Sequence, residues 1–191
     1  DLSKVPGAVW RNDEGEVVVN LEGPRPGTDE GMPYPARELW PTEQHFSIVS
    51  TERNFTAAMS NFGCPFRCEF CILRGDALRQ RSALSIVDEM EHCYHEFGIR
   101  EIDFFDPVFT IRRDRVYQIC DDLDRRTLKG LICSIRARTD ALDPALLERM
   151  WKSGGRRICS GIESGSNQIL QRFAKRMRST AHTGEVIRET K

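Results

Sequence analysis

The sequence predicts an α/β fold in which four strand–helix units form part of a parallel barrel. From residue 55 onward, apolar runs of strand length alternate with segments whose apolar residues recur at helical spacing. Repeated βα units require a parallel sheet with right-handed crossovers, which leaves an open doubly wound sheet or a barrel. Polar residues follow all four expected strands, and because barrels gather functional residues at these strand ends, the pattern favours the barrel.

Local start and stop signals place the individual elements. We expect strands at residues 55–59, 101–105, 131–135 and 157–162, and helices at 82–97, 114–128, 143–154 and 167–173, with further helix toward the end of the chain. Ser82 or Ser85 is the expected N-cap of the first helix, and Gly98 its stop. Asp143 caps the third helix, where Pro144 suits the first helical position. The residues that this third helix is expected to bury are Leu146, Leu147, Met150 and Trp151.

The first 45 residues differ in composition from the rest and are expected to form an extended linker. They contain six of the nine prolines, and residues 23–41 are typical of an extended connector. A short strand is expected at residues 17–19, directly after a turn. We therefore divide the chain into a linker, residues 1–45, and a barrel portion, residues 46–191.

The composition is that of an ordinary globular domain and excludes several classes of protein. Hydrophobic residues make up 39% of the 191 residues, enough for one core, and the net charge of −1 does not indicate binding to nucleic acid or to an anionic membrane. We expect no transmembrane segment and no signal peptide. The seven cysteines then indicate a reducing compartment, so a cytoplasmic location is expected. Because the first residue is Asp1, we expect a piece of a longer protein.

Three cysteines close together are the strongest chemical signal in the chain. They are Cys64, Cys68 and Cys71, at the spacing Cys-x3-Cys-x2-Cys. Thiolates suit iron–sulfur clusters and zinc, and three ligands on a four-iron cluster leave one iron open for substrate chemistry. Gly63 is expected to let the backbone approach the cluster closely, and Pro65 to fix the following turn.

The alternatives for this motif are a zinc site, a disulfide and buried structural cysteines. A structural zinc site needs a fourth ligand, for which Glu69 and His45 are poor candidates. Ferredoxin-type motifs have a fourth cysteine and a proline after the last one, whereas the proline here follows the first cysteine. The spacing therefore favours a cluster with one open iron.

The cysteine motif resembles the cluster-binding loop of radical S-adenosylmethionine (SAM) enzymes, in which an aromatic residue also precedes the third cysteine, as Phe70 does here. The resemblance implies that Cys64, Cys68 and Cys71 hold a [4Fe-4S] cluster, that SAM chelates the open iron, and that Phe70 lies near the adenine. The family fold is a partial barrel of six βα units. With four units expected here, the chain is expected to stop about two-thirds of the way through this barrel.

Two further segments resemble parts of this family. Residues 104–110 are similar to the Phe-x-Asp-x-x-Phe-Thr segment of its cobalamin-type subgroup, which implies that Asp106 accepts a hydrogen bond from the methionyl amine of SAM. The alternative is an aspartate that caps the following turn. Residues 161–166 are similar to the segment near the ribose or methionyl end of SAM, where the Glu163 carboxylate suits two ribose hydroxyls. The alternative is a solvated Glu163 beside a serine that caps the next helix.

Basic residues after the third and fourth expected strands are candidates for the SAM carboxylate, because a guanidinium can bind it with two parallel hydrogen bonds. Arg136 and Arg138 both qualify by position, and Arg138 agrees better with the family pattern. Lys175 is a further candidate, although a solvated basic face is the favoured interpretation of it. The remaining cysteines, expected to be small buried side chains, are Cys93, Cys120, Cys133 and Cys159.

The linker carries a resemblance of its own. Residues 5–11 and 32–40 resemble the linker of cobalamin-binding radical SAM proteins, the subgroup of proteins like the anaerobic magnesium-protoporphyrin monomethyl ester cyclases. The resemblance implies an upstream domain, outside this chain, through which cobalamin is a cofactor. Phe62 stands where the subgroup usually has arginine, and this departure weakens any substrate assignment.

The leading hypothesis is an enzyme that cleaves SAM reductively to methionine and a 5′-deoxyadenosyl radical. Methyl transfer to, or cyclisation of, a small-molecule substrate is the outcome that the resemblance implies. It also implies an electron donor such as flavodoxin or ferredoxin, and no nucleic acid is expected. The alternatives are a methylthiotransferase acting on tRNA or a ribosomal protein, for which no second cluster domain or basic tail is visible, and a non-enzymatic iron–sulfur or zinc module.

Overall fold

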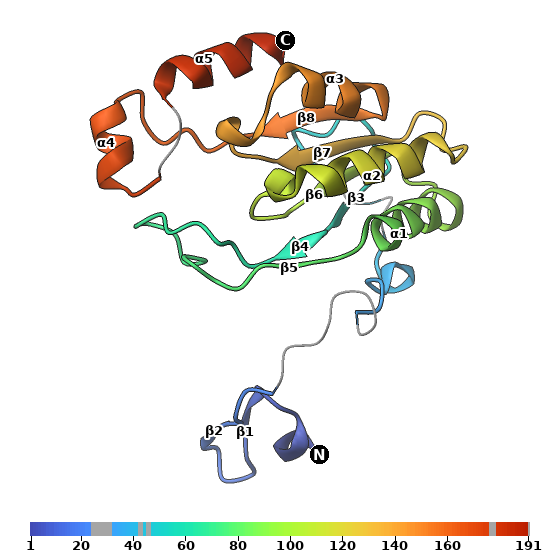
Figure 1. Cartoon of the computed structure of the whole chain (residues 1–191). Coiled ribbons are helices and arrows are strands. Elements are labelled where there is room, and N and C mark those ends of the chain that lie inside the picture. The colour runs from blue at the N-terminus through green and yellow to red at the C-terminus, as the bar shows by residue number, and fades with distance from the viewer. Residues whose placement is uncertain (24–31, 42–43, 45–46, 176–178, 191) are drawn as a thin grey trace. The chain divides into compact units, whose positions relative to one another are not determined.

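The computed structural model describes residues 1–23, 32–41, 44, 47–175 and 179–190. The chain forms two compact units, Asp1–Met32 and Pro33–Lys191, which are described separately (Figure 1). His45 and much of the connector expected at residues 23–41 lie outside the described residues.

The first unit is a small antiparallel hairpin preceded by one helical turn, η1 (Leu2–Lys4). β1 (Val9–Arg11) pairs with β2 (Val17–Val19), which confirms the strand expected at residues 17–19. Asn20 ties the hairpin to the segment before it, because its side-chain amide donates to two carbonyl oxygens there, each at 2.7 Å. Every side chain in residues 1–23 is exposed or half-buried, so hydrogen bonds rather than a core hold this unit together.

The second unit is built on a four-stranded parallel sheet. Its strands, in spatial order, are β3 (Phe55–Ala58), β6 (Glu101–Phe104), β7 (Ile132–Arg136) and β8 (Gly155–Cys159). Every neighbouring pair is parallel, which confirms the predicted α/β fold built from βα units. β3 and β8 are the two edges, so the four strands form an open arc.

β8 begins and ends earlier than the sequence pattern predicts. The expected strand covered residues 157–162, whereas the structure has Gly155–Cys159. Gly154 adopts a φ of +95°, and Gly155 packs so closely on the carbonyl oxygen of Met150 that a Cβ atom would lie 2.9 Å from it. Two glycines therefore turn the chain directly from the preceding helix into the strand, and the residues after Cys159 leave the sheet.

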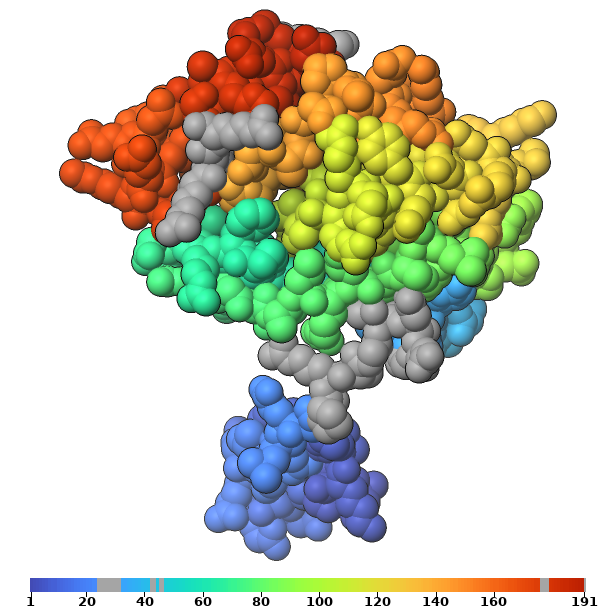
Figure 2. Space-filling view, viewed as in Figure 1, coloured from blue at the N-terminus to red at the C-terminus, as the bar shows by residue number. Residues whose placement is uncertain are grey.

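Three helices cover one face of the sheet: α1 (Ala83–Glu96), α2 (Arg113–Asp124) and α3 (Pro144–Lys152). They lie side by side in Figure 1, and the side chains of α2 and α3 form a continuous surface in Figure 2. α4 (Asn167–Arg172) and α5 (Thr180–Glu189) follow β8. None of the helices among the described residues has the length and hydrophobicity that crossing a bilayer requires.

The caps predicted for two of these helices are confirmed. The Ser82 side chain accepts a hydrogen bond from the backbone of Ser85 at the start of α1, and the Asp143 side chain does the same for Leu146 in α3. α2 is shorter than predicted, ending at Asp124 instead of residue 128, because the chain leaves the helix there to pack Leu128 against the core.

The hydrophobic core lies between the sheet and the three helices. The strand residues of this core include Ile102, Phe104, Cys133 and Ile135, and the helix residues include Ile86, Met90, Val116, Ile119 and Leu146. Burying one such side chain stabilises the fold by about 1.5–3 kcal/mol. Cys93, Cys120 and Cys133 are buried in this layer, as predicted.

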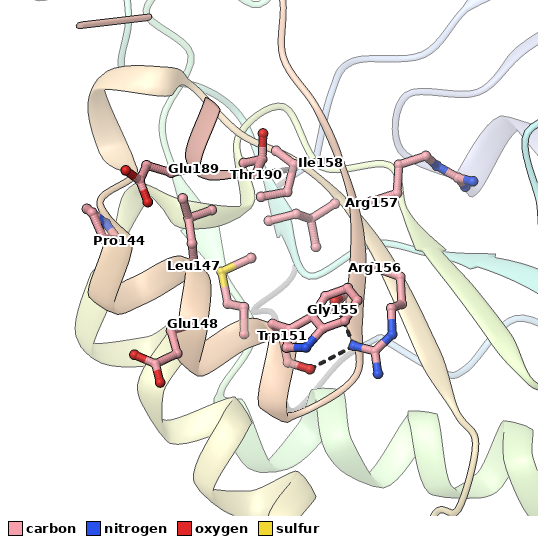
Figure 3. A pocket seen from close by; sticks show the side chains of 12 residues that line it. Pro144, Leu147, Glu148, Trp151, Gly155, Arg156, Arg157, Ile158, Glu189 and Thr190 are labelled. Carbon is pink, nitrogen blue, oxygen red and sulfur yellow. Dashed lines mark hydrogen bonds between the residues drawn. The ribbon is translucent and has the colours of Figure 1, made fainter. Parts of the chain in front are cut away.

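A cavity of about 420 Å³ lies at the β8 edge, between α3, β8 and the end of α5 (Figure 3). Leu147, Met150 and Ile158 line it. Trp151, which the helical spacing predicts to be buried, is 59% exposed beside this cavity, and the Arg156 guanidinium stacks 4.0 Å from the centre of its ring. The difference arises because β8 is an edge strand, and no further strand among the described residues covers this flank.

The face of the sheet opposite the helices carries a buried charge cluster centred on Glu101. One oxygen of Glu101 binds Arg157 of β8 at 3.0 Å and Ser134 of β7 at 3.3 Å. The other oxygen accepts hydrogen bonds of 2.8–3.0 Å from residues 50–52. One carboxylate at the start of β6 therefore joins three strands and the segment that precedes β3.

A buried ionic triad attaches η2 (Arg37–Leu39) to the second unit. Arg37 Nη2 lies 2.7 Å from one oxygen of Glu89, and Arg81 binds the other oxygen. All three side chains are at most 8% exposed. The two compact units divide between Met32 and Pro33, so Arg37 belongs to the second unit, where the triad binds it to α1. The expected linker of residues 1–45 stays a prediction.

Candidate functional site

The loop that carries the three cysteines, residues 63–78, is closed by a short antiparallel ladder. β4 (Asn61–Phe62) leads into the loop and β5 (Arg79–Gln80) leads out of it. Because β4 comes shortly after β3, the loop lies at the carboxyl edge of the sheet. Cys64, Cys68 and Cys71 line one cavity there. Its volume of about 460 Å³ falls in the range of small-molecule sites.

Backbone hydrogen bonds give the cysteine loop a compact form and connect it to the opposite wall of the cavity. Cys71 N donates to Cys68 O at 3.1 Å, which closes a turn between two of the cysteines. Glu69 N donates to Phe173 O at 2.9 Å, just after α4. Figure 1 accordingly shows α4 and the loop on the same side of the sheet.

Gly63 is required by a close approach between two parts of the loop. Its φ is +75°, and a Cβ atom there would lie 2.1 Å from the carbonyl oxygen of Ala77. We expected Gly63 to let the backbone approach a cluster. That expectation stays a prediction, and the structure gives Gly63 a further role: it lets the first residue of the loop pass against the last turn before β5.

The three cysteines lie close enough to influence one another electrostatically. Burial raises the pKa of the Cys64 thiol, and the thiols of Cys71 and Cys68 raise it further, against a backbone hydrogen bond at Phe66 that lowers it. A coordinating metal reverses this balance, because it deprotonates a bound thiol outright. Three soft donors that line one cavity therefore fit an iron–sulfur group.

The spacing of the donors also bears on the choice between a cluster and zinc. Within the part of the chain that the structure describes, no three His, Cys, Asp or Glu side chains are placed to bind a single metal ion. A four-metal cluster differs from a zinc ion because each thiolate binds a different metal atom. Three thiols that line one cavity can each bind a different metal atom of such a cluster.

The same cavity is lined by an ion pair between an exposed glutamate, Glu163, and a buried lysine, Lys175. Glu163 Oε1 lies 2.7 Å from Lys175 Nζ, which also donates to Gly161 O at 2.6 Å. Lys175 is only 7% exposed, so the favoured interpretation of a solvated lysine is corrected. Glu163 has a φ of +64°, the left-handed conformation that is strained for residues other than glycine. Strain of this kind concentrates at ligand sites, where the surroundings maintain it.

Arg138 lines the same cavity, but the edge of its guanidinium is already engaged. Nε and Nη2 donate to the two oxygens of Asp140 at 2.9 and 2.8 Å. Nη2 also donates to Lys175 O at 2.8 Å, and the group stacks 4.0 Å from the centre of the Phe66 ring. The edge that we expected to bind a carboxylate of SAM is thus bound to Asp140, and Arg138 braces the backbone of Lys175.

Phe70 connects the two walls at the rim of the cavity. Its ring is 52% exposed and meets the Phe173 ring edge-on, with 5.6 Å between the centroids. Lys175 Nζ lies 5.7 Å from the centroid of the Phe70 ring. The exposed aromatic face is therefore available for stacking on a ligand between the walls.

Two further side chains from the strand ends line the cavity. Arg136 binds Asp103 at 3.1 Å and stacks 3.6 Å from the centre of the Phe105 ring. Cys159, which we expected to be buried, is exposed and lines the cavity. The reason is strand alternation: Ile158 packs toward the helices, so its neighbour Cys159 faces the opposite side, in register with Arg136.

Asp106 lies away from the cavity. It is fully buried, and its carboxylate accepts hydrogen bonds from the backbone and side chain of both Ser60 and Asn61. Burial raises its pKa despite these hydrogen bonds. The contact expected between Asp106 and the SAM amine does not follow from this geometry. Its neighbours Pro107 and Val108 line the cavity instead.

The sequence reasoning missed Asp140 and Phe66 and undervalued Lys175. The Arg-x-Asp spacing at residues 138–140 was an available signal for an ion pair, and an aromatic residue between two cysteines was a signal for stacking. For Lys175 the chain offers no local signal, because its burial depends on the return of the chain after α4 to Gly161.

Comparison with known families matches residues 60–190 to the family described as the radical SAM superfamily. This span is more than half of the chain and includes all three cysteines of the loop. The chain belongs to the radical SAM superfamily, as the cysteine motif predicted.

Three curated relatives illustrate the position of the chain within this superfamily. It is 29% identical to an uncharacterized methyltransferase, PH0819, of Pyrococcus horikoshii, over 82% of this chain and 34% of the relative. It is 26% identical to the cytidylyl-2-hydroxyethylphosphonate methyltransferase of Streptomyces wedmorensis, over 97% of this chain and 40% of the relative. It is 29% identical to the anaerobic magnesium-protoporphyrin IX monomethyl ester cyclase of Rubrivivax gelatinosus, over 92% of this chain and 32% of the relative.

Two solved structures with the same fold have cobalamin bound. The cobalamin-dependent SAM radical enzyme OxsB, with aqua-cobalamin and SAM bound, superposes with a TM-score of 0.76 at 21% identity, over 100% of this chain and 28% of OxsB. The radical SAM methyltransferase TsrM of Kitasatospora setae, with cobalamin and a [4Fe-4S] cluster bound, superposes with a TM-score of 0.70 at 18% identity, over 99% of this chain and 39% of TsrM. These similarities show the fold, a partial barrel of the radical SAM type. The chain spans only 28–40% of the length of the five relatives described.

Proposed function

We propose that this chain binds a [4Fe-4S] cluster and SAM and forms the radical-generating part of an enzyme. The observation that carries the proposal is one cavity shared by the three cysteines and by the Glu163–Lys175 pair. Thiolates on one wall suit iron, and a carboxylate–ammonium pair on the other suits a zwitterionic ligand. When bound, the reduced cluster supplies the electron that cleaves SAM to methionine and a 5′-deoxyadenosyl radical.

The residues of the chain have distinct tasks in this proposal. Cys64, Cys68 and Cys71 hold the cluster. Glu163 Oε2 has no hydrogen-bond partner among the described residues and is available to the ribose hydroxyls, while Oε1 stays on Lys175. Lys175 Nζ pairs with that carboxylate and is available to the SAM carboxylate. Phe70 offers its ring to the adenine.

We further propose methyl transfer or cyclisation with cobalamin as the activity of the whole protein. Two of the curated relatives are named methyltransferases and one is named a cyclase, and both solved structures have cobalamin bound. We assign cobalamin binding to a part of the protein outside this chain. The substrate is a small molecule, which suits a cavity of about 460 Å³.

We also propose a one-electron donor such as flavodoxin or ferredoxin, and a reducing, cytoplasmic compartment. The seven cysteines support the compartment, since all of them are free thiols. A donor is required by the chemistry, because cleavage of SAM consumes an electron that the chain does not supply.

Anaerobic reconstitution with iron and sulfide tests the cluster assignment. We expect the wild-type chain to bind iron and sulfide in equal amounts, and a variant with Cys64, Cys68 and Cys71 all replaced by Ala to bind none. Cys159→Ala is the matched control, because Cys159 lines the same cavity and its loss is expected to leave the iron content unchanged. Unchanged iron in the triple variant contradicts the assignment.

A further inference from the structure

We propose that Ser60, Asp106 and Arg115 are positioning residues that hold both ends of the cysteine loop in the conformation that the cluster requires. The inference rests on the proposed function, since it concerns the same cluster. None of the three belongs to the described residues that line the cavity. They therefore act on the cluster through the backbone of the loop and not by contact with a cofactor.

A single guanidinium joins the two ends of the loop. Arg115 Nη1 donates to Ser60 O at 2.9 Å and to Arg81 O at 3.1 Å. Ser60 directly precedes β4, and Arg81 directly follows β5, so the two carbonyls belong to the chain entering and leaving the loop. Arg115 itself belongs to α2, whose position is set by the hydrophobic core.

Asp106 holds the entering end from another direction. Its Oδ1 accepts from Ser60 N at 2.6 Å and from Asn61 N at 3.2 Å. The Ser60 hydroxyl donates to Asp106 Oδ2 and accepts from Arg115 Nη2 at 2.7 Å. The hydroxyl thus bridges a carboxylate after β6 and a guanidinium on α2. Three elements distant in sequence meet at the residue that starts the path to the first cysteine.

The network is costly to bury, which indicates a role beyond packing. Ser60, Asn61 and Asp106 are fully buried and Arg115 is 5% exposed. Buried charges stabilise a fold little more than apolar side chains of similar volume, because desolvation offsets much of their attraction. Their directional hydrogen bonds, in contrast, specify one geometry. At this place the geometry that they specify is that of the two loop ends.

The loop needs such support, because residues 63–78 contain no helix or strand of their own. Three thiolates must reach one cluster together, and small displacements of supporting residues weaken a site of this kind. Fixing both ends limits the conformations of the loop between them. Asp106 is the aspartate of the Phe-x-Asp-x-x-Phe-Thr segment, and it does not line the cavity. Positioning the loop therefore gives this residue a function that needs no contact with SAM.

The test uses the reconstituted chain and the variants Asp106→Asn, Arg115→Lys and Ser60→Ala. Asn keeps the shape of Asp without the charge, and Lys keeps the charge of Arg without its fork of donors. We expect each variant to take up iron but to release it to a chelator faster, on the order of tenfold for Asp106→Asn and Arg115→Lys, because each loses a charge-assisted hydrogen bond. We also expect an altered electron paramagnetic resonance spectrum of the reduced cluster.

Glu101→Gln is the matched control. Glu101 is a buried carboxylate with several hydrogen bonds at the opposite end of β6, away from the loop. We expect it to lower the thermal stability without changing iron release or the spectrum. If Glu101→Gln accelerates iron release as much as the three variants do, the role of Ser60, Asp106 and Arg115 is merely structural and the inference is overturned. The inference is also overturned if Asp106→Asn and Arg115→Lys release iron at the wild-type rate.

Two remaining outcomes are equally decisive. A wild-type chain that binds no iron overturns the proposed function and this inference with it, whereas the outcomes above overturn the inference alone. Ser60→Ala removes only the bridging hydroxyl and decides the matter if the charged variants do not fold. Its iron release is then expected to exceed that of the wild type, and an unchanged rate contradicts the inference.

Discussion

Glu163 and Gly63 show how single residues at this site adopt backbone conformations that most side chains avoid. Glu163 has a φ of +64° and is held by the ion pair with Lys175. Gly63 has a φ of +75° and passes against the carbonyl of Ala77. In both cases the surrounding chain maintains the conformation; Glu163 presents an acceptor carboxylate to the cavity, and Gly63 allows the two ends of the loop to meet.

Replacement of Glu163 by Gln tests its assignment at the residue scale. The amide keeps the shape of the side chain but loses the charge that Lys175 binds and that we propose for the ribose hydroxyls. Loss of a charge-assisted hydrogen bond is expected to cost about 1.5–3 kcal/mol, so SAM should bind roughly 10- to 150-fold more weakly. Calorimetric titration of SAM into the reconstituted chain measures this, with iron content as a check.

Glu148→Gln is the control for that measurement. Glu148 is also paired with a lysine, Lys152, but on the exposed side of α3. We expect its SAM affinity to equal that of the wild type. An affinity in Glu163→Gln equal to that of this control would remove Glu163 from the SAM site.

At the scale of elements, the first two helices act as anchors as well as covers for the sheet. α2 contributes Arg115 to the ends of the cysteine loop, and α1 contributes Glu89 to the triad that binds Arg37. Arg81 takes part in both, since its side chain binds Glu89 and its carbonyl accepts from Arg115. A continuous series of buried polar contacts thus runs from η2 to the base of the loop.

Arg37→Met is the variant that tests this anchoring. Removing one guanidinium leaves the buried Glu89 with a single partner, and breaking a buried ion pair of this kind costs about 3–5 kcal/mol. We expect the free energy of unfolding, measured by urea denaturation, to fall by that amount. Arg112→Met, which breaks an exposed pair with Asp114, should change it little. A small effect in both variants would mean that η2 is not anchored through the triad.

At the scale of the whole second unit, Glu101 holds together parts of the chain that lie far apart in sequence. Burial alone would raise the pKa of Glu101, but hydrogen bonds from residues 50–52 outweigh it and hold the pKa below its ordinary value. The same carboxylate binds Arg157 of the edge strand β8. Its ionised form therefore links the segment before β3 to the far edge of the sheet.

This arrangement predicts how stability depends on pH. Because the pKa of Glu101 is lower in the folded than in the unfolded state, the unfolded state takes up the proton first as the pH falls. The contribution of Glu101 is fully present above the unfolded pKa of about 4.5 and is lost as the pH falls through the lower, folded pKa. Urea denaturation at a series of pH values measures the slope, which Glu101→Gln should reduce in this range.

Glu96→Gln serves as the comparison, because Glu96 is an exposed glutamate at the end of α1. We expect it to keep the slope of the wild type. If Glu101→Gln keeps that slope as well, the low pKa and the proposed link across the sheet are both contradicted.

Much of the fold was predictable because its signals are local. Apolar spacing indicated four strands and the helices between them, and the caps Ser82 and Asp143 were read from adjacent residues. The bounds of β8 were predicted less well, because two glycines and a close contact with Met150 decide where it begins. Trp151 was misplaced since helical spacing does not reveal that β8 is an edge.

The sequence by itself determined the family, the alternation of strands and helices, and the group of three neighbouring cysteines, because each depends on residues close together in the chain. The tertiary structure alone decided the partners of the isolated charges. It turned Asp106 toward Ser60 instead of the cavity, and it buried Lys175 against Glu163. It also exposed Cys159 beside the other cysteines. The physical reason is that burial and pairing depend on contacts between elements, which periodicity and spacing along the chain do not encode.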